Sequence, residues 1–447
     1  MIMNTLIRNA TIVNEGKTFV SDVLIEGESI KKIAKDISDF PRNTALIDAK
    51  GKILMPGIID DQVHFREPGL THKATIATES RAAVAGGITS FMEMPNTVPQ
   101  ATTQKLLENK FKIAAKSSYA NYSFMMGGTN DNLEELLKTN PKNVAGIKLF
   151  LGSSTGNMLV DDEEVLEKIF SSTKLLIAVH CEDETTIKKN LDKQKSIYGD
   201  DIPIEMHPVI RSAEACYKSS SKAIALAKKT GARLHVFHLS TAIETELFTN
   251  KIPLEEKQIT AEVCIHHLWF DDKDYQEKGT FIKWNPAVKS KKDKIGLWKA
   301  MLDDRIDVIA TDHAPHTLEE KKQVYTKAPS GGPLVQHGLL AMMEAVKRDK
   351  ISIEKVVEKM CHNPARLFKI EKRGFVKEGY YADLVLVDTN SPQTVDKENI
   401  LYKCGWSPFE GTTFHSTVTH TFVNGHLIYN KGVFNDSIKG KRLIFDR

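Results

Sequence analysis

Short apolar runs alternate with longer amphipathic segments along residues 53–312. Each run has the length of a strand and is rich in Val, Ile, Leu, Phe or Met, which is typical of strands buried on both faces. The runs that predict strands are 53–59, 88–94, 122–126, 144–150, 175–179, 234–237, 259–265 and 307–310. The intervening segments that predict helices include 75–85, 103–116, 161–170, 212–229 and 291–302. Thr241 and Glu244 have the spacing of a capping box, which predicts a further helix start at 240–244.

Eight strands that alternate with helices predict an α/β fold, a (β/α)8 TIM-like barrel. A doubly wound open sheet has the same alternation, but no GxGxxG motif follows the first predicted strand. Both ends of the chain differ from the middle, with shorter alternating strands and glycine-containing turns. Neither end has enough strands for a core of its own. We therefore expect a small flanking β-sandwich domain formed from both termini, residues 1–54 plus 372–447, beside a barrel of residues 55–371.

The composition is that of an ordinary globular protein, with 447 residues, 41% hydrophobic and 27% charged. The 61 basic and 58 acidic residues nearly balance at +3, which argues against nucleic acid or an anionic membrane as a partner. Five widely spaced cysteines, no secretory leader and no stretch of about 20 apolar residues favour a reduced, cytoplasmic enzyme.

Side chains able to bind metals stand where the predicted barrel strands end. His64 follows the first strand, Lys148 lies within the fourth, and three later strands end in His180, His238 and Asp312. A single histidine at a strand end is more often structural than a ligand. Several that converge on one mouth of a barrel, together with a carboxylate, favour a metal site. Imidazole and carboxylate are ligands that suit Zn²⁺.

Lys148 needs a separate explanation, because an ammonium group is repelled by a nearby divalent cation. Reaction of the neutral amine with CO₂ would give a carbamate, a carboxylate on a lysine stem that could bridge two metals. The alternative is a salt bridge to a barrel acid such as Glu262. The residue types alone leave both interpretations open.

Five segments resemble the motifs of dihydroorotases, which are members of the amidohydrolase superfamily, and two more resemble the C-terminal segment of that superfamily. They are PGIIDDQVHFREPG (56–69), MPNT (94–97), HLS (238–240), WNP (284–286), ATDHAPH (310–316), NPAR (363–366) and ADLV (382–385). The resemblance covers nearly the whole chain. It implies a zinc-dependent cyclic amide hydrolase with a barrel and a flanking β-sandwich. The implied reaction is the reversible cyclisation of N-carbamoyl-L-aspartate to L-dihydroorotate and water in de novo pyrimidine synthesis.

The resemblance also implies a role for each matching residue. The implied ligands of one or two zinc ions are His64, His180, His238, Asp312 and a carboxylated, bridging Lys148, and Asp312 would also carry the proton. The implied substrate contacts are Arg66, Asn96 and His316 at the α-carboxylate, and Asn285, Gly331 and Gly332 at the ring. Arg66 fits this role because a planar guanidinium binds carboxylates bidentately. The expected partners are the small-molecule substrate and further copies of the chain, in a homo-oligomer with a dimer favoured.

The first motif departs from the family's pattern, which has His-x-His where this chain has Gln62-Val63-His64. An amide oxygen is a poorer zinc ligand than imidazole, so the first metal position loses a strong contact. Both metals could still bind, or only the site with His180 and His238 could fill. The protein could also be a catalytically silent assembly partner of aspartate carbamoyltransferase. We favour an active enzyme, because the other implied site residues are present.

Another cyclic-amide hydrolase, such as an allantoinase or a hydantoinase, is the nearest enzymatic alternative. It would share the metal site but need different groups around the substrate. Arg66 and Asn96 favour a ring that carries a carboxylate, as dihydroorotate does.

Overall fold

Eight parallel strands form a barrel. In the computed structural model, which describes residues 4–152 and 158–447, these strands are neighbours in chain order. The first and last meet at a bridge between Val63 and His313, beside which the His64 N–H donates to the His313 carbonyl at 2.7 Å. The strands are β6 Ile58–Val63, β7 Ile88–Glu93, β8 Asn121–Gly127, β9 Gly146–Phe150, β10 Ile177–His180, β11 Leu234–Val236, β12 Ile259–Cys264 and β13 Val308–Ala310. The predicted barrel is confirmed; residues 1–3 and 153–157, inside the predicted ranges 1–54 and 55–371, lie outside the described residues.

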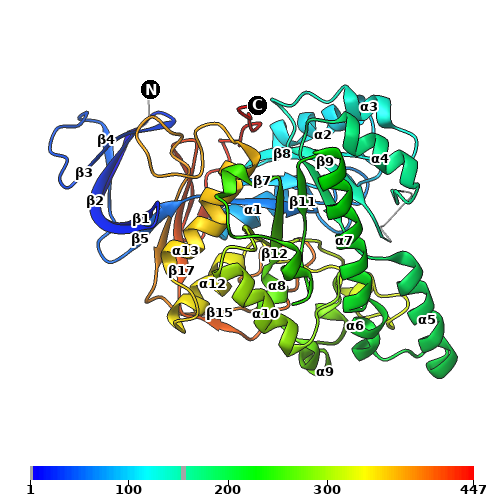
Figure 1. Cartoon of the computed structure of the whole chain (residues 1–447). Helices are drawn as coiled ribbons and strands as arrows, with labels where there is room; N and C mark the ends of the chain where they lie inside the picture. The colour runs from blue at the N-terminus through cyan, green and yellow to red at the C-terminus, as the bar shows by residue number, and fades with distance from the viewer. Residues whose placement is uncertain (1–3, 153–157) are drawn as a thin grey trace.

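Helices connect the barrel strands and surround them (Figure 1). Four predicted helices begin after a side chain that accepts a hydrogen bond from the backbone N–H three residues on: Thr75, Thr103, Ser212 and Ser290. The α-helices are α1 Ile76–Ala85, α2 Gln104–Ser117, α3 Leu133–Leu137, α4 Glu163–Ser172, α5 Glu184–Tyr198, α6 His207–Ile210, α7 Ala213–Thr230, α8 Ile265–Trp269, α9 Tyr275–Lys278, α10 Lys291–Leu302, α11 Leu318–Lys321, α12 Gly338–Lys347, α13 Ile353–Val357 and α14 Asn363–Phe368. Among helices within residues 4–152 and 158–447, none is long and apolar enough to cross a membrane.

The predicted helix start at 240–244 forms one of the two capping-box bonds but not an α-helix. The hydroxyl of Thr241 donates to the Glu244 carboxylate at 2.8 Å and accepts from the Glu244 N–H at 3.2 Å. Only a 3-10 turn, Glu244–Leu247, follows. The capping-box spacing therefore occurs here without the longer helix that it predicts.

A second sheet, of mixed strand direction, is built from both ends of the chain. Its central strand β1 pairs with β2, β4 and β5, and β5 pairs with β14 from the C-terminal part. In Figure 1 the blue N-terminal strands lie beside orange C-terminal strands at one side of the barrel. The strands are β1 Asn4–Asn14, β2 Lys17–Glu26, β3 Ser29–Ala34, β4 Thr44–Asp48, β5 Ile53–Pro56, β14 Leu384–Asp388, β17 Thr417–Val423, β18 His426–Asn430 and β19 Val433–Phe434. The predicted flanking β domain, formed from both termini, is confirmed.

The predicted strand 53–59 is wrong as a single strand, because the structure divides it at Gly57. β5 ends at Pro56 in the second sheet, and β6 begins at Ile58 in the barrel. A Cβ at Gly57 would lie 2.0 Å from the hydroxyl oxygen of Thr89, so only glycine fits where the chain passes between the sheets. The division into 1–54 plus 372–447 and 55–371 as domains stays a prediction.

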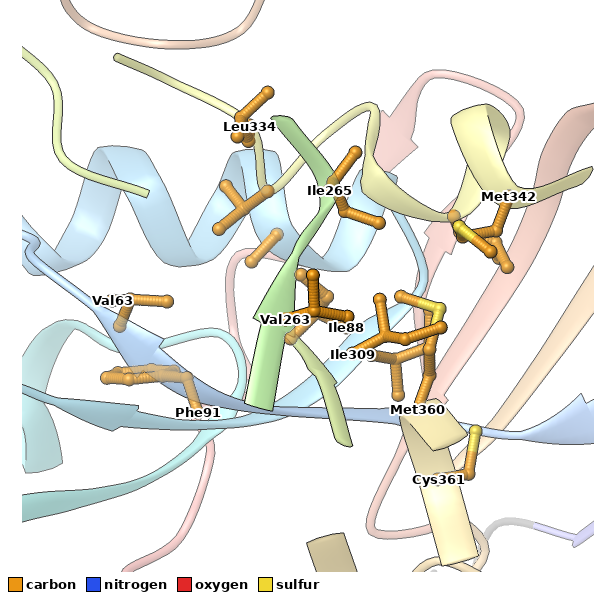
Figure 2. Packing of buried hydrophobic residues seen from close by; sticks show 14 of the residues in the cluster. Val63, Ile88, Phe91, Val263, Ile265, Ile309, Leu334, Met342, Met360 and Cys361 are labelled. Carbon is orange, nitrogen blue, oxygen red and sulfur yellow. The ribbon is translucent and has the colours of Figure 1, made fainter. Parts of the chain in front are cut away.

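The main hydrophobic core packs side chains of the barrel strands against helices and loops. Figure 2 shows part of it, including Val63, Phe91, Val263, Ile309 and Met360. Each of these side chains is at most 1% exposed. Truncating such a residue to alanine typically costs about 2–5 kcal/mol, so this core firmly holds the strands whose ends form the site.

Candidate active site

The predicted site residues gather around one pocket at the end of the barrel where the strands terminate. Its volume is about 160 Å³. Every predicted metal ligand lines it, as do all the predicted substrate contacts except Gly332. The lining residues are Gln62, His64, Arg66, Asn96, Lys148, Phe150, His180, His238, Trp284, Asn285, Asp312, Ala314, His316, Pro329, Ser330 and Gly331.

Three of these residues have an unusual backbone conformation. Arg66, His238 and Asp312 have positive φ angles of 68°, 40° and 47°. Residues other than glycine rarely adopt this left-handed region, and such conformations concentrate at functional sites. Each of the three follows a barrel strand, so the chain turns sharply at the strand end where the pocket lies.

His64 lies between Asp312 and Asn96. Its Nε2 is 3.3 Å from Asp312 Oδ1, and its Nδ1 is 2.8 Å from Asn96 Oδ1. Because an amide oxygen only accepts, Nδ1 carries the proton and Nε2 presents its lone pair. Burial, together with the charges of Arg66 and Lys148, holds the pKa of His64 far below its usual range, so the ring is neutral. Burial raises the pKa of Asp312 to about 7, although Lys148 opposes this rise.

His180 and His238 form a second pair. His180 Nδ1 is 3.0 Å from His238 Nε2, and His180 Nε2 is 3.1 Å from Glu182 Oε2. Arg211 forms an ion pair with the same carboxylate. Burial would raise the pKa of Glu182, but Arg211 and His180 lower it to about 2, so the carboxylate is ionised. Glu182 and Arg211 were not predicted, although a carboxylate two residues beyond a strand-end histidine was a usable signal.

Lys148 is buried and lines the same pocket as both pairs. Its ammonium nitrogen lies 4.2 Å from the ring centre of Phe237 and 4.9 Å from that of Phe150. It forms no hydrogen bond or ion pair with the residues that the structure describes, so the alternative salt bridge to Glu262 is not formed. Burial lowers the pKa of Lys148 to about 7, although Glu262 and Asp312 raise it. A large fraction of the amine is therefore neutral at pH 7.

The donor atoms and their spacing fit a zinc site. In tetrahedral geometry, two ligands with bonds of about 2.0 Å lie about 3.3 Å apart. The separations of 3.3 Å within His64–Asp312 and 3.0 Å within His180–His238 are close to this value. Nζ of Lys148 is also buried without a hydrogen-bond partner among the described residues. Buried polar atoms in folded proteins are usually satisfied, so this nitrogen indicates a missing partner.

Arg66 and His316 form another side of the pocket. Arg66 Nε donates to the Pro315 carbonyl at 3.0 Å, and Nη2 is 3.1 Å from His316 Nε2. The side chain is buried and forms no ion pair with any acid in the described parts of the chain. Burial lowers the pKa of Arg66 to about 10, which leaves it protonated at neutral pH. A buried guanidinium without an acid partner, beside a pocket, suits an anionic ligand.

Lys73 is a second cation that contacts His316, at the ring nitrogen opposite Arg66. Lys73 Nζ is 3.0 Å from His316 Nδ1 and 2.8 Å from Glu320 Oε1. Burial and the charge of Arg66 hold the pKa of His316 far below its usual range, so its ring is neutral. Lys73 was not predicted, because nothing in its sequence neighbourhood indicates that it contacts His316.

The remaining predicted substrate residues differ in whether they line the pocket and in whether their polar groups are free to bind a ligand. Asn285 lines the pocket, and its Oδ1 is buried without a hydrogen bond to a described residue. Gly331 also lines it, with φ 128°, but its N–H already donates to the Lys283 carbonyl at 2.8 Å. Gly332 lies outside the lining, and a Cβ there would approach the Trp284 ring to 2.6 Å. Glycine at 332 therefore lets the loop pack against Trp284.

Known proteins place this barrel among the cyclic amide hydrolases. The chain belongs to the amidohydrolase family, whose model matches residues 53–428. It is 33% identical to the dihydroorotase of Methanosarcina mazei over 91% of this chain and 90% of that protein. It is 30% identical to the dihydroorotase of Lactobacillus johnsonii over 96% of this chain and 100% of that protein. Among solved structures, an L-hydantoinase (dihydropyrimidinase) from Arthrobacter aurescens superposes with a TM-score of 0.93 at 27% identity, covering 99% and 100% of the chains.

Proposed function

We propose that this enzyme is a dihydroorotase, which interconverts N-carbamoyl-L-aspartate and L-dihydroorotate in pyrimidine synthesis. The observation that carries the proposal is Arg66, a buried guanidinium in the pocket of the predicted metal ligands, without an acid partner in the described structure. Dihydroorotate carries a carboxylate on its ring, and Arg66 can bind that group directly. The similarity to dihydroorotases over nearly their whole length supports the same assignment.

Zinc is the proposed cofactor, as one or two ions. His64, His180, His238 and Asp312 would hold it, with Lys148 as a bridging carbamate. When bound, zinc polarises the amide carbonyl and lowers the pKa of water from about 15.7 toward 7. The carbamate forms when the neutral amine of Lys148 attacks CO₂, so that an N–C bond forms and a proton is released. The lowered pKa of Lys148 supports this step.

Asp312 is the proposed proton carrier. In hydrolysis its carboxylate accepts the proton of the attacking water and delivers it to the ring nitrogen that leaves, and in cyclisation the transfers run in reverse. The pKa of about 7 suits a group that both takes and gives a proton near neutral pH. Burial of Asp312 also keeps bulk water from competing for this proton.

Arg66, Asn96 and His316 are the proposed partners of the substrate's α-carboxylate. Arg66 and His316 are adjacent, and Asn96 is held by His64, so the carboxylate site lies beside the proposed proton carrier. At the ring we propose Asn285 and the backbone of Gly331 and Gly332. Because the Gly331 N–H is engaged by a carbonyl, residue 331 would present its own carbonyl group instead.

Gln62 stands where the family's motif has a histidine. This departure raises the alternative of a catalytically silent protein that is an assembly partner of aspartate carbamoyltransferase. Gln62 is buried in the pocket lining, and its side-chain oxygen lies 3.7 Å from the sulfur of Cys264. Loss of activity would be expected to remove several site residues, yet the implied ligands His64, Lys148, His180, His238 and Asp312 and the implied carboxylate contacts Arg66, Asn96 and His316 are all present. This supports an active enzyme. The hydantoinase alternative draws on the similarity to the Arthrobacter aurescens protein, and Arg66 argues against it.

Assays in both directions test the proposal. Zinc-loaded protein is incubated with L-dihydroorotate and, separately, with N-carbamoyl-L-aspartate, and bound zinc is measured on the same sample. We expect ring opening with the first and ring closure with the second. No turnover of either substrate by fully loaded protein would contradict the proposal, and a stable complex with aspartate carbamoyltransferase would then support the silent role. The dimer and the cytoplasmic location stay predictions.

A further inference from the structure

Three ionisable side chains lie together inside the barrel but outside the pocket lining. They are Asp61 on β6, His235 on β11 and Glu262 on β12. Ala178 is the register partner of both Lys148 and His235, so these two side chains point to the same face of the sheet, the barrel interior. All three members of this interior triad are 0% exposed. None belongs to the predicted ligand set.

The three side chains of the triad point toward one another, but their facing atoms form no hydrogen bonds with each other. His235 Nε2 lies 3.3 Å from Asp61 Oδ2 and 3.9 Å from Glu262 Oε2. One ligand atom from each residue falls within 4.8 Å of the others. Both oxygens of Asp61, Nε2 of His235 and Oε2 of Glu262 are buried with no hydrogen-bond partner in the described structure. Buried polar atoms are rarely left unsatisfied, so four at one point indicate a shared ligand.

The tautomer of His235 identifies the kind of ligand. Its Nδ1 is 2.8 Å from the hydroxyl of Thr260, and that hydroxyl donates to the Leu234 carbonyl at 3.3 Å. The hydroxyl has one proton, so it accepts from Nδ1–H, and in the neutral ring Nε2 carries a lone pair aimed at the carboxylates. Histidines that bind metals have this arrangement, donating their other ring N–H to an oxygen. A lone pair facing two carboxylates is repulsive unless a cation lies between them.

We propose that Asp61, His235 and Glu262 bind a divalent transition-metal ion, zinc in the first instance, at a site separate from the catalytic one. The distance of 3.3 Å between His235 Nε2 and Asp61 Oδ2 is about that of two ligands on one tetrahedral zinc. Two ionised carboxylates would balance the charge of the ion.

The site would stabilise the strand end that bears a predicted catalytic ligand. The other oxygen of Glu262, Oε1, accepts from the His238 N–H at 3.2 Å and from the Cys264 thiol at 3.1 Å. A metal on Oε2 would fix this carboxylate and, through it, the backbone at His238, whose φ of 40° needs external support.

The competing arrangement has protons instead of a metal. Burial lowers the pKa of His235, but the facing carboxylates of Asp61 and Glu262 raise it to about 9. Burial and the charge of Asp61 raise the pKa of Glu262 to about 8. An imidazolium with one neutral and one ionised carboxyl group would also be electrically balanced. That arrangement requires an N–H from Nε2 directed at a carboxylate oxygen.

Anomalous diffraction at the zinc absorption edge separates the two arrangements. Crystals of the full-length protein are grown with zinc chloride. We expect an anomalous peak bounded by Asp61, His235 and Glu262, with bonds of about 2.0–2.2 Å to one atom of each. Density without a peak there, with Nε2 of His235 hydrogen-bonded to a carboxylate, overturns the proposal.

Zinc content in solution gives a second test with a matched control. Asp61→Asn should lose one zinc equivalent per chain in elemental analysis after dialysis. Asp60→Asn should retain it, because the neighbouring Asp60 carboxylate is already bonded to the Thr311 hydroxyl at 2.6 Å and to the N–H groups of Thr311 and Gln62 at 3.3 Å. Equal zinc contents in the two variants overturn the proposal. If Asp61→Asn does not fold, the diffraction experiment on the unaltered protein decides.

Discussion

Removing the guanidinium of Arg66 should impair catalysis only for substrates that carry a carboxylate. In the variant Arg66→Met the side chain keeps an apolar stem of similar length but loses its donors. Nε of Arg66 donates to the Pro315 carbonyl, and Nη2 lies beside His316. Nη1 forms no hydrogen bond with the described residues. One terminal donor is therefore the minimum that the substrate can use.

The size of the effect follows from that count. One hydrogen bond to a charged group contributes about 1.5–3 kcal/mol, and each 1.4 kcal/mol is tenfold. We expect kcat/KM for L-dihydroorotate to fall roughly 10- to 150-fold. For 5,6-dihydrouracil, which has the same ring without the carboxylate, kcat/KM should hardly change. Steady-state assays of both substrates with zinc-loaded protein measure the two effects.

Lys73→Met is the matched control. It also removes a cation that contacts His316, but Lys73 is paired with Glu320 and does not line the pocket. Its effect on dihydroorotate turnover should be clearly smaller than that of Arg66→Met. Equal losses for dihydroorotate and dihydrouracil in Arg66→Met would refute the reasoning, because they would show that Arg66 only supports the pocket's structure.

Further predictions concern Asp312, Lys148 and Asp60. Asp312→Asn should lower kcat about 100- to 10,000-fold, the usual contribution of a positioned general acid or base, while the melting temperature stays close to that of the unaltered protein; near-normal kcat would remove Asp312 from its proposed role. Lys148→Met cannot form a carbamate, so zinc per chain should fall in elemental analysis together with activity, and an unchanged zinc content would exclude Lys148 as a ligand. Burial raises the pKa of Asp60 from 3.8 to about 7, so between about pH 4 and pH 7 the folded state holds a proton that the unfolded state has released. Its contribution to the free energy of unfolding should therefore fall as pH rises through that window, by up to about 4 kcal/mol, and Asp60→Asn should flatten the slope in denaturant titrations at each pH.

Much of the fold follows from the sequence because barrel strands have a strong signal. Strands buried on both faces are continuous apolar runs, and the caps Thr75 and Ser290 mark helix starts sharply. The run 53–59 was wrongly predicted to be a single strand because β5 and β6 are both buried and both apolar. Only the close approach of Thr89 to Gly57 reveals the change of sheet, and that contact depends on the folded chain.

The site was predictable to the extent that it depends on strand ends. Carboxyl ends of parallel strands meet at one mouth of a barrel, so His64, His180 and Asp312 come together whatever their distance in sequence. The ion pair of Arg211 with Glu182 could not be predicted from strand ends, because Arg211 follows the short helix α6 rather than a barrel strand. Its position depends on how the loops fold back over the barrel.

The interior triad was missed for a different reason. His235 and Glu262 stand within apolar strands, where a single polar residue carries no functional signal. Their meeting with Asp61 depends on the stagger of three strands that are not all neighbours. Register at this level is set by side-chain packing in three dimensions, which the pattern of apolar and polar positions does not specify.

Substrate preference tests the central claim most directly. The measurement is the ratio of kcat/KM for L-dihydroorotate to that for 5,6-dihydrouracil, with zinc-loaded, unaltered protein. A dihydroorotase that binds the carboxylate through Arg66 should prefer dihydroorotate by at least about tenfold, the value of one charge-assisted hydrogen bond. Turnover of dihydrouracil that equals or exceeds that of dihydroorotate would contradict the account and favour a hydantoinase-like enzyme.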